Sequence, residues 1–311
     1  MARFLLTGAA GFIGSHVARA LVHDGHEVHA LLRESTDTWR IADLLASLRV
    51  VTADLESEAL SAAVTHARPE VCLHLAWYAV PGQYLDSPEN LRQLEASLRL
   101  VRAVADAGGR RFVGAGTCFE YELRAEPLSE DAPTRPTRLY AACKLALATV
   151  LGAVRPRLSL STAWARLFYV YGPAEPEARL VPSVIRRLLR GETAAVTEGT
   201  QVRDYVHVKD VAQGLVRLAL SGVEGCVNVG SGAPVTVRDV VSRAAEAAGR
   251  PDLVAFGARP QDPLDPPFVC ADIRRLREEV GFTPAIGLPD GLRETVEWWS
   301  ARMERAASEA P

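Results

Sequence analysis

The sequence lacks an excess of positive charge, a long apolar run and any local cluster of cysteines. Its 311 residues carry 35 Lys and Arg against 38 Asp and Glu, so no basic field is available for nucleic acid or an anionic membrane surface. No apolar run approaches the roughly 20 residues of a membrane span. Without C-x-x-C or Cys/His spacing, we expect neither a metal site nor disulfides at the five scattered cysteines: Cys72, Cys118, Cys143, Cys226 and Cys270. These absences predict a reduced, cytoplasmic protein that binds neither nucleic acid nor membrane.

What the sequence does contain is an alternation of short apolar runs and helix-length segments. The runs are bounded by Gly, Asp or Pro and lie at residues 4–7, 28–32, 50–51, 71–75, 112–113 and 161–168. Helical patterns are expected at residues 12–23, 57–65, 89–107 and 140–154. Because the first run starts so early, we expect no secretory signal before it. Short runs of this kind are typical of parallel strands buried on both faces, so the pattern predicts an α/β fold with a doubly wound parallel sheet.

The pattern changes after Tyr171-Gly172. Prolines interrupt the alternation at positions 173, 176 and 182, and shorter elements follow at residues 184–190, 210–220 and 237–248, before a last helix at 288–302. At this length a chain exceeds one ordinary core. We therefore expect a dinucleotide-binding domain over residues 1–172. Residues 173–311 are expected to form mainly a smaller α/β substrate lobe, with some chain returning to the first domain.

A glycine-rich turn connects the first strand to the first helix. It reads Thr7-Gly8-Ala9-Ala10-Gly11-Phe12-Ile13-Gly14, with G-x-x-G-x-x-G spacing. Such a turn lets backbone amides and a helix N-terminus approach a pyrophosphate. Three glycines could also serve only a tight turn, but their place in an alternating chain favours a dinucleotide site that includes Gly8, Gly11, Phe12, Ile13 and Gly14.

The end of the second strand bears on the choice of cofactor. Leu32 stands where an NAD site usually carries an acid, and Arg33 follows it. An arginine can bind a 2′-phosphate, so we expect NADP(H), with NAD as the alternative. Asp54 and Leu55 follow the third strand and are expected beside the adenine, although Asp54 could simply cap a helix.

Tyr140 and Lys144 stand four residues apart in a predicted helix. This spacing puts both side chains on one face, where the cation is expected to lower the pKa of the phenol into a range useful for acid–base work. Thr117 lies upstream at the end of a predicted strand. Alone, a Y-x-x-x-K pair is more often an ordinary surface pair, but the combination with Thr117 and the glycine turn favours catalysis.

Together these residues resemble the extended short-chain dehydrogenase/reductases of the NAD-dependent epimerase/dehydratase family, which act on nucleotide sugars. The resemblance rests on TGAAGFIGSH (7–16), HLA (74–76), Thr117/Tyr140/Lys144, RLFYVYGP (166–173), RDYVHVKDVA (203–212), NVGSG (228–232) and RPQD (259–262). It implies a Rossmann domain, Tyr140 as acid/base, Lys144 on the nicotinamide ribose and Thr117 on the reacting oxygen. It further implies Leu75 and Ala76 beside the cofactor and Arg203 and Arg259 on the nucleotide diphosphate.

Several aromatic residues depart from the family pattern. Tyr169 replaces an Asn of the R-x-F-N-x-Y-G-P motif, and Trp77-Tyr78 follows HLA where small residues are common. We expect Tyr169, Trp77 and Tyr78 to border the sugar, although Trp77 and Tyr78 could equally pack a loop.

The residues after Thr117 limit the reaction. Dehydratases of the family place an Asp-Glu pair there, but this chain has Cys118 and Phe119, which we expect to contact the substrate. A thiol and a ring are poor proton donors, and Glu120 is offset by one residue, so elimination of water is disfavoured. Without a nearby histidine, Cys118 is better explained as a packing residue than as a nucleophile.

Two redox reactions remain. We expect reduction of a keto group, at C4, of a nucleotide-activated 6-deoxyhexose, as in the 4-ketoreductases that GTCFEY and HLAW resemble. The alternative is a nucleotide-sugar 4-epimerase with retained NAD, and a non-catalytic dinucleotide-binding regulator is a third possibility. A homodimer formed by the helices at 89–107 and 140–154 is expected from their apolar residues on more than one face.

Overall fold

A seven-stranded parallel sheet forms the centre of the larger lobe in the computed structural model, which describes residues 1–263 and 265–308. The spatial order is β10-β6-β5-β4-β1-β2-β3. This is the predicted doubly wound Rossmann fold, and its order of strands reverses direction between β1 and β4. The strands are β1 (Arg3–Thr7), β2 (Glu27–Leu32), β3 (Arg49–Thr52), β4 (Val71–His74), β5 (Arg111–Thr117), β6 (Ser161–Leu167) and β10 (Gly225–Val229).

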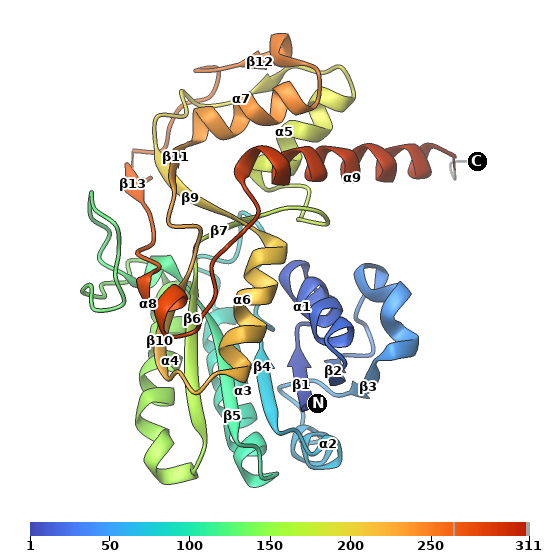
Figure 1. The fold of residues 1–311 in the computed structure, drawn as a ribbon, viewed down its shortest axis with the longest axis vertical. Coiled ribbons are helices and arrows are strands. Elements are labelled where there is room, and N and C mark those ends of the chain that lie inside the picture. Colours follow the sequence, from blue (N-terminus) through green and yellow to red (C-terminus); the bar gives the residue numbers. More distant parts are fainter. Residues whose placement is uncertain (264, 309–311) are drawn as a thin grey trace.

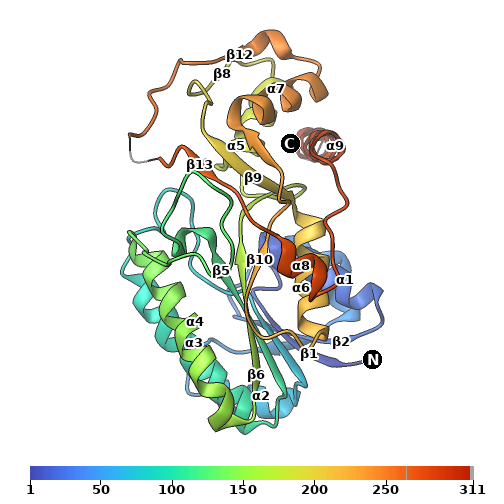
Figure 2. The ribbon, with the colours of Figure 1, turned by 60° about the vertical axis from the view of Figure 1, so that its left-hand side comes forward.

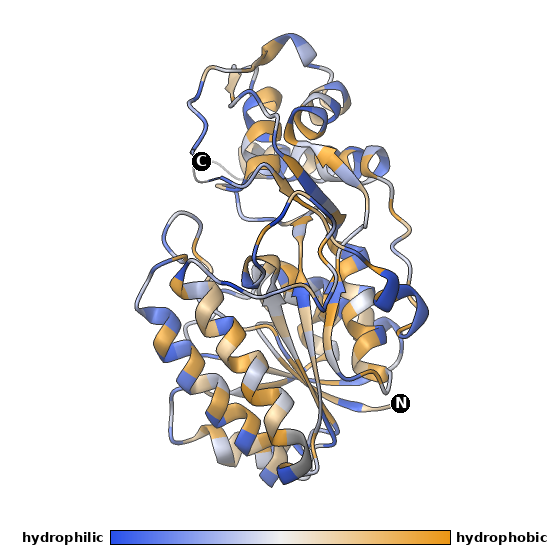
Figure 3. Cartoon of the chain, turned by 90° about the vertical axis from the view of Figure 1, so that its left-hand side faces the viewer, coloured by the Kyte–Doolittle hydropathy of each residue, from blue (hydrophilic) through white to orange (hydrophobic). Residues whose placement is uncertain are grey.

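Helices cover both faces of this sheet (Figures 1 and 2). One face packs against α1 (Phe12–His23), η1 (Trp39–Ser47), α6 (Val208–Leu220) and α8 (Arg274–Glu278), and the other against α2 (Leu60–Ala67), α3 (Glu89–Asp106) and α4 (Leu139–Leu158). Leu5 and Leu6 are neighbours on β1 and are fully buried in the two different cores. Burial on both faces explains why the strands read as continuous apolar runs, which Figure 3 shows as hydrophobic colour along the sheet.

A smaller α/β lobe stands over the carboxyl ends of the central strands (Figure 1). Strands β7 (Tyr169–Tyr171), β9 (Val202–His207), β11 (Pro234–Thr236) and β13 (Phe268–Val269) form one sheet, and β8 (Ala194–Ala195) pairs with β12 (Val254–Ala255). The helices α5 (Leu180–Leu189), α7 (Val237–Ala247) and α9 (Leu288–Ser308) pack against them, and the short turn η3 (Pro251–Leu253) lies beside α7. The other short turn, η2 (Cys118–Glu120), directly follows β5 in the larger lobe. The chain crosses between lobes more than once, since α6 and β10 belong to the larger one.

The structure extends two elements beyond their sequence patterns. β5 continues past the apolar pair at 112–113 to Thr117, because Gly114 and Gly116 leave room for Trp164, which a Cβ at either position would meet at 2.5 and 2.1 Å. Pro182, which interrupts the sequence pattern, lies in the first turn of α5, where a missing N–H costs no helical hydrogen bond. Because of this extension, Thr117 lies at the carboxyl end of β5, on the side of the sheet that faces the smaller lobe.

Candidate active site

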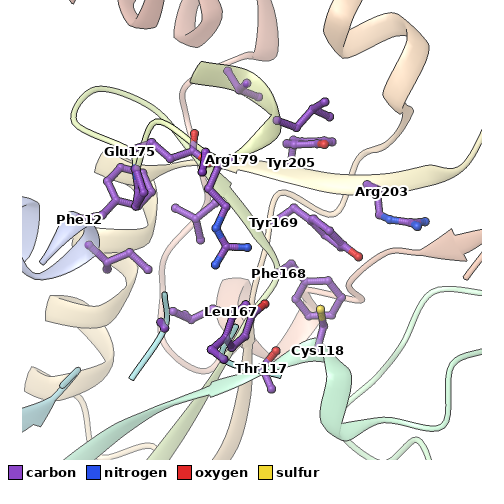
Figure 4. A pocket seen from close by; sticks show the side chains of 18 of the residues that line it. Phe12, Thr117, Cys118, Leu167, Phe168, Tyr169, Glu175, Arg179, Arg203 and Tyr205 are labelled. Atoms are coloured by element: carbon purple, nitrogen blue, oxygen red, sulfur yellow. The ribbon is translucent and has the colours of Figure 1, made fainter. Parts of the chain in front are cut away.

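A cavity of about 740 Å³ lies between the two lobes, at the carboxyl ends of β1, β4 and β5. Its wall is formed by the glycine turn, the segments after β4 and β5, the start of α4, β7 and the first part of the smaller lobe. Ligands of open α/β sheets bind in this crevice. Figure 4 shows side chains from both lobes converging on it.

The glycine turn forms one end of the cavity, and the residues predicted to bind a dinucleotide there all lie in the lining: Gly8, Gly11, Phe12, Ile13 and Gly14. Gly8 has φ +73°, which favours glycine, and a Cβ at Gly14 would lie 2.0 Å from the carbonyl oxygen of Gly8. No side chain caps the N-terminus of α1, and its first turn holds no acidic residue. Free amides at a helix start, reached by bare glycine backbone, fit a pyrophosphate.

Other residues predicted to bind the cofactor lie at different places. Leu75 lines the cavity, whereas Ala76, beside it, does not and instead donates its backbone N–H to Thr7 Oγ1 at 3.1 Å. Arg33 is exposed outside the lining, and its backbone N–H donates to Thr36 Oγ1 at 3.0 Å.

Asp54 and Leu55 also lie outside the lining. The Asp54 carboxylate accepts the backbone N–H of Glu56 at 2.9 Å, and the Leu55 side chain is buried in the core. Asp54 therefore closes a local turn and does not cap α2, whose N-cap is Ala59.

The three predicted catalytic residues are brought to the same wall. Thr117 ends β5, and Tyr140 and Lys144 lie in the first turns of α4, so that all three line the cavity. The Lys144 ammonium is buried and donates to the Ala115 carbonyl at 2.8 Å. Burial lowers the pKa of Lys144 to about 7.

The expected lowering of the tyrosine pKa is wrong for this arrangement. Burial raises the pKa of Tyr140 instead, and the neighbouring Tyr84 and Glu120 add to the rise. The Lys144 nitrogen lies 5.8 Å from the centre of the Tyr140 ring and is directed to Ala115 and Trp77. The phenol is therefore protonated at neutral pH.

Glu120 has no free oxygen for acid catalysis. It accepts the Thr117 backbone N–H at 2.9 Å, the Trp164 indole N–H at 3.0 Å and Arg166 Nε at 2.8 Å, and its side chain is fully buried. Cys118 lines the cavity with its thiol protonated, since burial raises its pKa to about 12. The segment after Thr117 thus offers no free carboxyl group and no thiolate.

The residues predicted to contact the substrate also line the cavity: Trp77, Cys118, Phe119, Tyr169, Arg203 and Arg259. The Phe119 and Tyr169 rings meet edge to face at 6.2 Å. The buried Arg203 guanidinium lies 5.3 Å from the Tyr169 ring centre and pairs with Asp265 at 2.6 Å. These contacts fix the orientation of the Arg203 guanidinium in the cavity wall.

Sequence reasoning missed three residues of the wall. Arg179 lies 5.3 Å from the ring centre of Tyr84, whose ring meets that of Tyr140 at 4.8 Å, and Figure 4 shows Arg179 pointing into the cavity. Glu175 is buried in the wall, one of its oxygens lacks a hydrogen-bond partner in the described structure, and burial raises its pKa to about 8. None of these residues belongs to a motif that the sequence analysis used.

A family model described as the NAD dependent epimerase/dehydratase family matches residues 4–230. The chain belongs to this family. A UDP-glucose 4-epimerase from Mycolicibacterium smegmatis is 32% identical over 309 residues, covering 96% of this chain and 98% of the relative.

Solved structures of the same family have the same fold. The UDP-glucose 4-epimerase from Thermotoga maritima with UDP-glucose has a TM-score of 0.87 at 26% identity, over 96% of this chain and 99% of that one. The protein MoeE5, in complex with UDP-glucose and NAD, has a TM-score of 0.83 at 35% identity, with the same coverage. The family assignment supports an enzyme that acts on nucleotide sugars with a nicotinamide cofactor.

Among the residues that the structure describes, no helix is long and apolar enough to cross a membrane. No group of three or more His, Cys, Asp or Glu side chains among them is arranged to hold a metal ion.

Proposed function

We propose that this protein is an NAD-dependent nucleotide-sugar 4-epimerase. The observation that carries the proposal is the joint placement of Thr117, Tyr140 and Lys144 on the cavity wall while Glu120 is held by Arg166 and Trp164. These residues can exchange a proton with one oxygen of a substrate. The segment after Thr117 supplies no acid that could protonate a departing hydroxyl, so elimination of water is disfavoured. The names of the relatives support epimerisation more than the net reduction expected from sequence.

NAD is the cofactor we propose, in place of the NADP(H) expected from Arg33. Arg33 lies outside the cavity lining, and MoeE5 was solved with NAD. The uncapped start of α1 and the bare backbone at Gly8 and Gly14 would hold the pyrophosphate. When bound, the nicotinamide supplies the acceptor and donor of a hydride.

The side chains of the wall have distinct roles in this proposal. Tyr140 exchanges the proton of the C4 oxygen, and the Thr117 hydroxyl donates a hydrogen bond to that oxygen. Lys144 binds a ribose hydroxyl of the cofactor. Arg203 and Arg259 lie farther along the lining, where guanidinium groups suit the diphosphate of a nucleotide sugar.

A ketoreductase is the second candidate, and one observation favours it. Burial raises the pKa of Tyr140, which keeps a proton on the phenol and suits donation to a ketone. Arg33 would then be tested as a contact of the 2′-phosphate of NADPH.

Product analysis separates the candidates. Purified protein incubated with UDP-glucose and related UDP-hexoses, with NAD present, should form the C4 epimer with no net change in reduced nicotinamide. Stoichiometric consumption of NADPH with an NDP-4-keto-6-deoxyhexose, without epimerisation, would support the reductase instead. A dehydrated sugar product would overturn both candidates.

A further inference from the structure

Trp77 lies directly against the catalytic pair. The Lys144 nitrogen is 3.8 Å from the centre of the Trp77 ring, and the Trp77 and Tyr140 rings meet nearly perpendicular at 6.4 Å. An ammonium over the face of an indole is attracted by the negative face of the ring. Trp77 therefore contacts the cation itself rather than only bordering the cavity.

A chain of hydrogen bonds through Asn90 fixes the Trp77 ring. Its indole N–H donates to Asn90 Oδ1 at 2.8 Å. The fully buried Asn90 in turn donates to the backbone carbonyls of Tyr84 at 2.6 Å and Ser87 at 2.9 Å. The two bonds that Asn90 donates fix its side chain, and the bond that it accepts from the indole N–H holds the Trp77 ring plane toward Lys144.

The titratable groups around Lys144 do little to stabilise its buried positive charge. Glu120 on η2 favours the charged form, but its carboxylate is bonded to Arg166. His74 on β4 is neutral, since burial lowers its pKa to about 3, and Tyr140 on the same helix keeps its proton.

Among the described residues, the Ala115 carbonyl at 2.8 Å and the Trp77 ring centre at 3.8 Å lie closest to the ammonium, and the ring centres of Tyr140 and Trp164 lie farther away, at 5.8 Å each. An ammonium has three donors. With one on Ala115 and one directed at the ring, one is left for a cofactor hydroxyl.

We propose that Trp77 is a positioning residue that holds Lys144 as an oriented ammonium ion beside Tyr140 through a cation–π contact. Its kinetic consequence rests on the proposed function, because the reaction needs a charged Lys144. The charge state of Lys144 can be measured without any substrate.

The sequence offers a direct way to observe this charge. Lys144 and Lys209 are the only lysines in the chain, so protein labelled with ¹³C at the lysine ε carbon gives two NMR signals. A Lys209→Arg variant assigns them. The Lys144 signal should be shifted by the ring current of Trp77, and its pH titration should give the pKa directly.

Three proteins are compared by that titration: the wild type, Trp77→Phe and Trp77→Leu. The pKa of Lys144 should fall in that order, with a total change of about one unit, because the phenyl face attracts a cation less than the indole face and leucine not at all. If the ring acted only by excluding water, smaller side chains would hydrate the ammonium and raise its pKa. A rise, or equal values in all three proteins, would overturn the proposal.

The kinetic measurement uses the same variants. Lys144 loses its charge as pH rises through its pKa, so a lower pKa in Trp77→Leu should move the fall in turnover to lower pH. Turnover should then be about tenfold below wild type on the alkaline side and nearly equal on the acid side, with Trp77→Phe between them. A loss of turnover that is equal at every pH would indicate a merely structural role.

Tyr78→Leu is the matched control. Tyr78 is the next residue of the same loop, donates its hydroxyl to Gln83 Oε1 at 3.0 Å and does not line the cavity. It should leave the Lys144 titration and the pH profile unchanged. If no tested substrate is turned over, the proposed function fails while the NMR order still decides the role of Trp77.

Discussion

The substitution Gly14→Ala tests the cofactor turn most directly. An alanine Cβ at this position would lie 2.0 Å from the Gly8 carbonyl oxygen, 2.7 Å from its carbon and 3.1 Å from Ala9 Cα. All three atoms belong to the backbone, so no side chain can rotate away. Relief requires the turn and the start of α1 to separate by about 1 Å.

The size of the effect follows from this displacement. Overpacking a tight contact costs about 1 to 3 kcal/mol, and a free energy of that size corresponds to roughly a 5- to 150-fold change in an equilibrium constant. We therefore expect Gly14→Ala to weaken NAD binding by roughly 10²-fold in titration calorimetry. Its free energy of unfolding in urea should fall by about 1 to 3 kcal/mol.

Gly152→Ala provides the control for a glycine in a helix. Gly152 is exposed within α4, and a Cβ there would meet no atom within 4 Å. Alanine should stabilise α4 by about 0.5 to 1 kcal/mol and leave NAD affinity unchanged. Wild-type NAD affinity in Gly14→Ala would refute the assignment of this turn to the cofactor.

Four more predictions concern chemistry, cofactor choice, stability and assembly. Tyr140→Phe should lower turnover by roughly 10² to 10⁴ with little change in NAD affinity, and near-normal turnover would exclude Tyr140 as the acid/base. Arg33→Asp should leave NAD binding intact if our cofactor proposal holds, whereas a marked loss of NADPH relative to NADH would restore the expectation from sequence. Glu120→Gln should destabilise the fold by about 3 to 5 kcal/mol in urea, because it leaves the Arg166 guanidinium, only 4% exposed, without its anion. We expect a homodimer formed through α3 and α4, since Leu91 of α3 is 56% exposed, and sedimentation at micromolar concentration should show it. A monomer at that concentration would contradict this prediction.

The fold, and the placement of Thr117, Tyr140 and Lys144 on one wall, could be predicted from local sequence patterns. Strands β1 and β4 are buried on both faces, so their sequences are continuous apolar runs, and α1 is buried on one face, so its apolar residues recur with the period of a helix. Both patterns can be recognised in the sequence alone. The spacing of Tyr140 and Lys144 likewise fixes a shared helix face, and the glycine turn between β1 and α1 marks where backbone must be bare.

Only the tertiary structure decided where charges and rings face one another. Lys144 meets Trp77 and Ala115. Burial of the Tyr140 phenol, with Tyr84 and Glu120 nearby, raises the tyrosine pKa where the sequence predicted a fall. These pairs lie far apart in sequence, on β5, α4 and the loop after β4, so no spacing records them. Desolvation depends on everything packed around a group, which is why the pKa values of Tyr140 and Lys144 could not be obtained before the cavity was known.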